Sequence, residues 1–238
     1  MKPEVAAEPE VQGRSVAREY LESIAVAVIL ALFVRTFAVQ AFKIPTASME
    51  DNLLIGDHLL VNKLVYSPSF SSFEERLFGK KAIARGHVVV FKYPKEPERD
   101  FIKRVIGLPG EKVEVRGKQV LIDDKPLDES YTFFKNESMH ASEAEYAARG
   151  EDTLSSWGPH EVPPGHLFVM GDNRDNSSDG RVWGFLPIDQ VKGRALVIYW
   201  SYEATREEYH ATGAWQWFKD TLSAFGRTRW GRFFHLIR

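Results

Sequence analysis

Hydrophobic and polar positions divide the chain into a polar lead, one long apolar run and many short apolar runs. Residues 1–19 are polar and of mixed charge, which predicts a flexible tail. Residues 24–34 are all apolar, and with their flanks this stretch reaches from residue 20 to residue 42. That length suits a membrane-spanning helix, provided that Glu22 and Arg35 lie near the two interfaces.

Three structures fit this apolar stretch. A cleaved signal peptide has an apolar core of this length, but the polar segment before such a core is shorter than residues 1–19 and clearly basic. A core helix of a globular protein needs no more than the apolar residues 24–34. We favour a single-pass membrane anchor over residues 20–42, for a reason that the residues after it supply.

Beyond residue 42 the pattern becomes that of strands. Short apolar runs are separated by Gly, Pro, Asp and Ser, and residues 108–111 place Pro and Gly as a type II turn requires. Residues 129–162 are less regular. The pattern predicts a mainly β fold with a core over residues 43–128 and 163–213, an inserted segment over 129–162, and the N-terminal transmembrane helix.

The C-terminal segment, residues 214–238, is rich in aromatic and basic side chains. This composition fits a membrane interface, where rings and cations lie at the level of the lipid headgroups. It fits equally a terminal segment whose aromatic rings pack on the core while its charges stay in solvent. Both interpretations remain open at this point.

Composition limits the chemistry. The chain has 238 residues, with 31 Lys and Arg against 33 Asp and Glu, so a broadly basic nucleic-acid-binding protein is not expected. The absence of Cys excludes disulfides, Cys-ligated zinc and a thiol nucleophile. Asp172 and Asp175 lack calcium-loop spacing, and Arg174 and Arg181 would repel a cation. We therefore expect no metal and no cofactor, with any catalysis resting on Ser, Thr, Lys, His or carboxylates.

Four segments carry the candidate chemistry: residues 42–49 (FKIPTASM), 85–91 (RGHVVVF), 101–110 (FIKRVIGLPG) and 171–181 (GDNRDNSSDGR). Their order and spacing resemble the bacterial type I signal peptidases over about residues 21–200. The last segment is the most specific of the four. The resemblance implies a Ser–Lys signal-peptidase-like β core with an antiparallel β extension.

The resemblance also implies roles for individual residues. Ser48 matches the nucleophile of the family, and Lys103 matches its general base. Thr46 matches a hydroxyl residue that helps the Ser48 backbone N–H to form the oxyanion hole. Ser177 matches a serine that orients the lysine.

Further matches concern the support of the site and its substrate pockets. Asp179 and Arg181 match a structural ion pair beneath the site. The apolar lining of the substrate pockets is matched by Phe42, Ile44, Leu53, Val90 and Ile102.

The chain departs from the family pattern close to the nucleophile. Asp51 replaces a proline that is usual three residues after the catalytic serine, and Thr46-Ala47 replaces the commoner Ser-Gly. These changes affect the stiffness of the loop and the geometry of the oxyanion hole. They leave the proposed nucleophile and base in place.

A Ser–Lys pair requires that the lysine lose its proton, because a charged amine cannot accept one from serine. An unperturbed Lys has a pKa of about 10.4, so only about one in 2,500 is neutral at neutral pH. On a strand, Lys103 shares its face with Phe101 and Val105, whereas Ile102 and Arg104 point the other way. Apolar neighbours would remove water from the amine and lower its pKa. The same alternation conflicts with Ile102 lining the same pocket, unless the substrate runs along the strand edge.

Three alternative functions fit parts of the sequence. A histidine base in a Ser-His-Asp triad is the minority interpretation; His58 lies nearest Ser48 in sequence, and no Gly-x-Ser-x-Gly elbow exists. A soluble, self-cleaving Ser–Lys repressor-like protease would lack an anchor. A non-catalytic, membrane-tethered peptide-binding β module would need no neutral lysine.

The substrate expected from the resemblance explains the preference for an anchor. Secretory signals end at an Ala-x-Ala-like site just outside their apolar core, so the enzyme that reads them must work at the membrane surface. Ser48 follows the apolar stretch closely, and cleavage of that stretch would discard this placement. We therefore expect exported preproteins and the lipid bilayer as partners, no nucleic acid, and a single-pass protein of the bacterial cytoplasmic (inner) membrane with its catalytic domain on the outer face.

Overall fold

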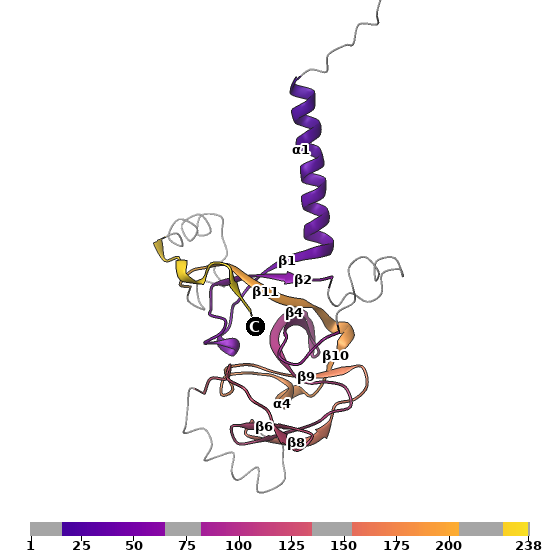
Figure 1. Ribbon diagram of the computed structural model, residues 1–238, viewed down its shortest axis with the longest axis vertical. Helices are drawn as coiled ribbons and strands as arrows, with labels where there is room; N and C mark the ends of the chain where they lie inside the picture. Colours follow the sequence, from indigo (N-terminus) through magenta and orange to yellow (C-terminus); the bar gives the residue numbers. More distant parts are fainter. Residues whose placement is uncertain (1–15, 65–81, 135–153, 205–225, 238) are drawn as a thin grey trace, which may run out of the picture. The chain divides into compact units, whose positions relative to one another are not determined.

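The computed structural model describes residues 16–64, 82–134, 154–204 and 226–237 (Figure 1). The chain divides into two compact units, residues 1–38 and residues 39–238. The first unit is helical as far as it is described, and the second is built mainly of β-strands.

The N-terminal unit is one helix, α1 (Val16–Phe33), followed directly by a π-helical turn, η1 (Val34–Ala38). No residue of α1 is buried, and its apolar side chains are exposed. Within the described ranges, no helix has both the length and the apolar character that crossing a membrane demands. The helix begins earlier than expected, because residues 16–19 of the predicted tail belong to it, and Arg18 pairs with Glu22 one turn later at 2.8 Å.

The far end of the predicted helix also differs from the expectation. Residues 39–42, expected to continue the apolar helix, lie in strand β1 (Val39–Lys43), which pairs antiparallel with β2 (Asp57–Asn62). Pairing with β2 satisfies the backbone, and alternation turns Phe42 toward the core while Ala41 stays exposed. Hydrophobicity alone could not separate these residues from the helix before them.

The second unit contains two antiparallel sheets. The larger has the strand order β1-β2-β11-β3-β4-β9-β10, with β12 paired to β11, and the smaller has the order β7-β6-β5-β8. The mainly β, antiparallel prediction is therefore confirmed. The remaining strands of the large sheet are β3 (Val88–Tyr93), β4 (Glu96–Gly107), β9 (His166–Met170), β10 (Leu186–Pro187), β11 (Val191–Ser201) and β12 (His235–Leu236). The strands of the small sheet are β5 (Lys112–Arg116), β6 (Gln119–Ile122), β7 (Lys125–Pro126) and β8 (Ser156–Glu161).

Four short helices complete the described part of the unit, and each lies in a connection between strands. They are η2 (Ala47–Met49), α4 (Gly180–Trp183), η3 (Ile188–Gln190) and η4 (Trp230–Arg232).

The centre of the large sheet is buried on both faces, which explains its continuous apolar runs. In β3, Val88 and Val90 pack in one apolar cluster, whereas Val89 and Phe91 pack in another. A strand covered on both faces loses the alternation of apolar and polar residues. A third cluster, around Trp157 and Phe168, joins the small sheet to the large one.

Residues 129–162, expected as an insertion, are partly integrated into the body. Strand β8 pairs with β5, and Phe133 forms a bridge with Asn173 in which its N–H donates to the Asp172 carbonyl at 2.9 Å. Residues 135–153 lie outside the described residues.

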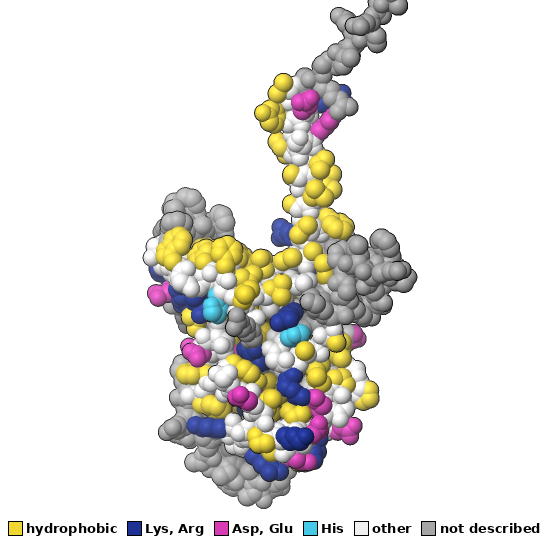
Figure 2. Space-filling view, viewed as in Figure 1, with side chains coloured by type: hydrophobic (Ala, Val, Ile, Leu, Met, Phe, Trp, Pro, Cys, Tyr) yellow, Lys and Arg dark blue, Asp and Glu magenta, His cyan; other side chains and the backbone are white. Residues whose placement is uncertain are grey.

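Of the C-terminal segment 214–238, residues 226–237 are described. Strand β12 pairs with β11. Trp230, Phe234 and Leu236 are exposed, and Ile237 is buried. The described residues therefore include both exposed and core-packed apolar side chains, and Figure 2 shows apolar side chains gathered over the end of the body that carries β11 and this segment.

Candidate active site

Ser48 lies on the short helix η2, directly after β1. Ile44 ties the end of β1 to the start of β2, because its N–H donates to the Asp57 carbonyl at 2.9 Å. Met49 is fully buried and anchors the turn in the core. The neighbouring Ser48 keeps 8% of its surface exposed. The Leu53 N–H donates to the Met49 carbonyl at 2.7 Å and closes the loop.

Lys103 lies on β4 and reaches Ser48 from the neighbouring wall. Its Nζ is hydrogen-bonded to Ser48 Oγ at 2.6 Å and to the Ile102 carbonyl at 2.9 Å. The same short contact suits both protonation states, because a charged amine donates to the hydroxyl and a neutral amine accepts from it. The two residues are 55 positions apart in the sequence and meet only through the fold.

The surroundings of Lys103 disfavour its charge. The residue is only 3% exposed, and its Nζ lies 5.4 Å from the centre of the Phe101 ring. Burial lowers the pKa of Lys103 to about 8, although the carboxylates of Asp179 and Asp172 act to raise it. At pH 7 about one amine in ten is then neutral, against about one in 2,500 for a free lysine.

The side chains of β4 alternate between the two faces of the sheet as the sequence indicated, but the amine of Lys103 turns toward the edge of the strand. Ile102 packs with the core cluster that contains Met49, whereas Phe101 and Val105 pack in the cluster on the other face. Because Nζ bonds the carbonyl of Ile102, the amine lies at the edge of its own strand. Both Lys103 and Ile102 can therefore contribute to one site.

The segment 171–181 holds the backbone around Ser48. A Cβ on Gly171 would lie 2.3 Å from Ser177 Oγ and 2.5 Å from the Ser48 carbonyl oxygen, so only glycine fits there. The Asn173 N–H donates to the Ser48 carbonyl at 3.2 Å, and its side-chain amide donates to the Ala47 carbonyl at 3.1 Å. Asn173 thus fixes both residues, a role that the sequence analysis did not assign to it.

Asp179 and Arg181 form a buried ion pair beneath this segment, with Nη2 and Oδ2 2.9 Å apart. Asp179 also accepts hydrogen bonds from the Gly171 and Arg181 backbone N–H groups. Burial opposes ionisation, but Arg181, the Gly171 N–H and the neighbouring Ser177 hydroxyl hold the pKa of Asp179 below its usual value. Arg181 further donates to the Leu154 carbonyl at 2.7 Å.

Among the described residues, two members of the predicted site form no hydrogen bond with Ser48 or Lys103. Ser177 Oγ is buried beside Asp179, has no hydrogen-bond partner of good geometry among the described residues, and is not bonded to Lys103. Thr46 is exposed, and its side chain does not cap η2. Their roles in orienting the lysine and in the oxyanion hole stay predictions.

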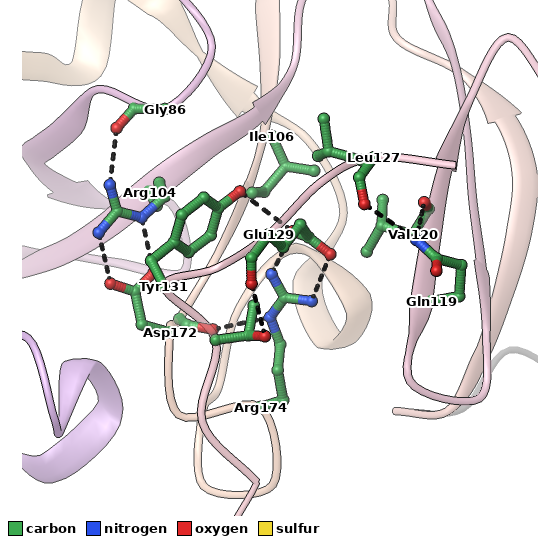
Figure 3. A network of polar contacts seen from close by, with 12 residues as sticks. Gly86, Arg104, Ile106, Gln119, Val120, Leu127, Glu129, Tyr131, Asp172 and Arg174 are labelled. Carbon is green, nitrogen blue, oxygen red and sulfur yellow. Dashed lines mark hydrogen bonds and ion pairs between the residues drawn. The ribbon is translucent and has the colours of Figure 1, made fainter. Parts of the chain in front are cut away.

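A second buried ion pair joins β4 to the segment 171–181 (Figure 3). Arg104, next to Lys103, donates through Nε and Nη2 to both carboxylate oxygens of Asp172, at 2.8 and 2.6 Å. The Asn52 amide donates to the same carboxylate at 2.9 Å. The Tyr131 ring lies 4.1 Å from the Arg104 guanidinium carbon. This network links the loop after Ser48 to the strand that carries Lys103.

A third pair extends the network. Arg174 donates to Glu129 at 2.5 Å, and both side chains are buried. From the sequence, Asp172 was considered only as a metal ligand, and its pairing with Arg104 was not predicted. No local signal marks these pairs, because their members lie 68 and 45 residues apart.

The five predicted pocket residues lie in one part of the core. Ile44, Leu53, Val90 and Ile102 belong to a single apolar cluster, against which Phe42 packs. Met49, the residue after Ser48, belongs to the same cluster, so the cluster lies next to the turn that carries Ser48.

His58, the histidine nearest Ser48 in sequence, lies in a different environment. Its ring packs against Tyr199, Trp200 and Tyr202. Burial lowers the pKa of His58 to about 4, and the charge of Lys43 lowers it further than Asp57 raises it. The Ser48 hydroxyl is instead hydrogen-bonded to Lys103.

The loop after Ser48 follows a backbone path that proline cannot take. Asp51 has a φ of +82°, whereas the proline ring fixes φ near −65°. We expect Asp51→Pro to lower the free energy of unfolding by about 2 kcal/mol or more, because the loop must be rebuilt. Asp51→Gly, which removes the strain of the left-handed backbone, should have a free energy of unfolding equal to or above that of the wild type. Urea unfolding of both variants tests this, and a fully stable Asp51→Pro protein would contradict the argument.

Comparison with known proteins places these residues in a family context. Residues 17–200 match the family described as signal peptidase, peptidase S26. Signal peptidase I of Aquifex aeolicus is 35% identical over 228 residues, covering 77% of this chain and 84% of the relative. Signal peptidase I of Leptolyngbya laminosa is 37% identical over 190 residues, covering 76% of this chain and 79% of the relative. A crystal structure of a signal peptidase I from Enterococcus faecalis is 32% identical, covers 48% of this chain and 97% of its own, and has a TM-score of 0.36.

Proposed function

This chain belongs to the signal peptidase family, peptidase S26, and from that premise we propose that it is a membrane-anchored serine endopeptidase that uses Ser48 and Lys103 to remove signal peptides from exported preproteins. The observation that carries the proposal is the 2.6 Å contact between Lys103 Nζ and Ser48 Oγ in a site where the lysine is almost fully buried.

The reaction follows from these two groups. Neutral Lys103 takes the proton of the Ser48 hydroxyl as Oγ attacks the scissile carbonyl. The protonated amine then delivers a proton to the leaving amine, and an acyl-enzyme on Ser48 remains. Lys103, neutral again, activates the water that hydrolyses this ester. The Ser48 N–H and the Thr46 hydroxyl are the proposed donors to the oxyanion, and Ser177 is the proposed orienting residue for the lysine.

The strand edges around the dyad support binding of an extended peptide. β1 is the end strand of the large sheet. Strand β9 pairs with β4 only from Arg104 onward, so within the described residues Phe101–Lys103 have a strand partner, β3, on one side. An extended substrate can add to such edges through backbone hydrogen bonds, while alternate side chains enter pockets.

The apolar cluster beside Ser48 supports a preference for small side chains. Its members are packed closely, with Ile44, Leu53 and Val90 each 2% exposed or less. Side chains packed this closely leave room for only a small substrate residue against them, which favours alanine. The proposed cleavage site is therefore Ala-x-Ala-like, as in secretory signals.

Attachment to the bacterial cytoplasmic membrane is the remaining part of the proposal. The exposed apolar side chains of α1 support a single-pass anchor over the N-terminal helical residues, with the catalytic body on the outer face. The exposed rings of Trp230 and Phe234 support contact of the C-terminal segment with the lipid interface. The preprotein and the bilayer are the proposed partners.

The test uses the full chain in lipid vesicles with a purified preprotein that has Ala at positions −1 and −3. We expect one cut after the −1 residue, located by sequencing the new N-terminus, and no cut in a matched precursor with Leu at −1. A precursor that binds but stays intact would indicate a peptide-binding module. Cleavage restricted to the chain itself would indicate a self-processing protease, and either result would refute the proposal.

A further inference from the structure

Ile237, at the end of the described chain, lies in the cluster proposed to hold the substrate. It is 9% exposed and packs in the cluster that contains Ile44, Leu53, Val90 and Ile102. The residues just before it are far more open, with Phe234 at 76% and Leu236 at 61% exposed. The last described side chain thus turns into the core while its neighbours face solvent.

The C-terminal arm, defined here as residues 226–237, is tied to the main sheet. β12 pairs with β11, and the Ile237 N–H donates to the Leu196 carbonyl at 2.9 Å. The Arg229 N–H donates to the Ser201 carbonyl at 2.9 Å. Chain ends fray unless such contacts hold them, so the position of Ile237 is built into the fold.

The same arm is tied to the loop that follows Ser48. Arg232 pairs with the buried carboxylate of Asp57 at 2.7 Å, and its Nη2 donates to the Asn52 carbonyl at 2.8 Å. Arg229 Nη1 donates to the Ile55 carbonyl at 3.1 Å. These bonds flank Leu53, which is itself a proposed pocket residue. The arm and the loop therefore form one wall of the cluster.

We propose that Ile237 is a specificity-determining residue that closes a substrate pocket and keeps it small enough to favour alanine. The proposal rests on the function proposed above and adds a pocket wall that comes from the C-terminal arm. Ile is branched at Cβ and stiff, so it fills a fixed volume in the cluster that also contains Leu53 and Ile102. Shortening it to alanine removes three carbons from that wall and leaves room for a larger substrate side chain.

The test compares cleavage of matched precursors with Ala, Val or Leu at position −3, and separately at −1. In Ile237→Ala, the ratio of kcat/KM for the Val precursor to that for the Ala precursor should rise roughly tenfold at one of the two positions, the effect expected for one or two methylene groups in an apolar pocket. Ile237→Val should give a smaller rise. Leu236→Ala, which shortens the exposed neighbour, should leave the ratio unchanged.

The outcomes separate this inference from the proposed function. If Ile237→Ala or Ile237→Val is folded and cleaves the Ala precursor with unchanged selectivity, Ile237 is not a pocket wall, and the protease function stands. If Ile237→Ala fails to fold, the ratio of kcat/KM for the Val and Ala precursors measured with Ile237→Val decides between the same two outcomes. A faster cut of the Ala precursor by a chain lacking residues 233–238 would mean that the arm blocks the site, which also overturns the assignment. No cleavage by the wild type would refute the function itself.

Discussion

Replacing Lys103 with methionine is expected to lower kcat/KM for preprotein cleavage by about 10³-fold or more, while the fold is kept. Methionine has a similar length and an apolar side chain, so it fills the buried space next to Phe101 without offering a proton acceptor. A positioned general base contributes about 10²–10⁴-fold to such reactions. Single-turnover cleavage of one precursor by the wild type and the variant measures the loss.

The pH dependence of the wild type provides the second readout of this prediction. Because burial lowers the pKa of Lys103 to about 8, kcat/KM should rise with pH and level off above about pH 8. Lys92→Met, the same substitution at an exposed lysine of β3, should keep both the rate and the profile. A Lys103→Met protein that cleaves at the wild-type rate would show that another group is the base.

The same substitution should stabilise the protein near neutral pH. The pKa of Lys103 is about 8 in the folded state and 10.5 without the fold, so the unfolded chain binds more protons between these values and the stability of the wild type rises with pH across that window. Below pH 8 the buried charged amine lowers the free energy of unfolding by roughly 3 kcal/mol, at 1.36 kcal/mol for each pKa unit. The lost hydrogen bond to Ser48 offsets about 1 kcal/mol of the gain. Urea unfolding of Lys103→Met should therefore show a gain of about 2 kcal/mol at pH 7, and at pH 10.5 a loss of up to about 1 kcal/mol, because only the missing hydrogen bond remains.

Replacing Ser48 with alanine is expected to abolish cleavage, with a loss of about 10⁵-fold or more, because no acyl-enzyme can form. The substitution removes one oxygen and leaves Met49, Leu53 and the strand edges in place, so the precursor should still bind. Copurification of intact precursor with the variant, together with sequencing of any product, measures both effects.

A matched serine provides the control. Ser130→Ala changes an exposed serine and should cleave like the wild type. Full processing of the precursor by Ser48→Ala would remove Ser48 from the mechanism and leave the 2.6 Å contact with Lys103 as a structural bond.

Sequence patterns predicted the fold class, because strands and turns leave local signals, whereas the segments that hold Ser48 and Lys103 were singled out by their resemblance to the signal peptidases. The residues around Ser48 and Lys103 stood out by order and spacing. The end of the N-terminal helix at Ala38 was not predicted, since residues 39–42 are apolar apart from Gln40, and pairing with β2 decides their structure. Alternation correctly separated the faces of Lys103 and Ile102 but could not show that the amine bends to the strand edge.

Long-range contacts explain the other omissions. The Arg104–Asp172 pair joins residues 68 positions apart, and Arg232 meets Asp57 across 175 positions. Neither pairing leaves a local pattern, because in the sequence each partner looks like any charged residue of the surface. The burial of Ile237 was equally hidden, since the apolar residues Trp230, Phe234 and Leu236 of the same segment are exposed.

The anchoring of the two ends of residues 135–153 has a practical consequence. Phe133 is bonded to Asp172 and Arg174, and Leu154 accepts a hydrogen bond from Arg181, so both ends meet the same rigid support. Extending a tethered chain between fixed ends costs only about 0.6 kcal/mol for each doubling of its length. We therefore expect that a fluorescent domain or an affinity epitope inserted between these ends leaves cleavage intact at little thermodynamic cost.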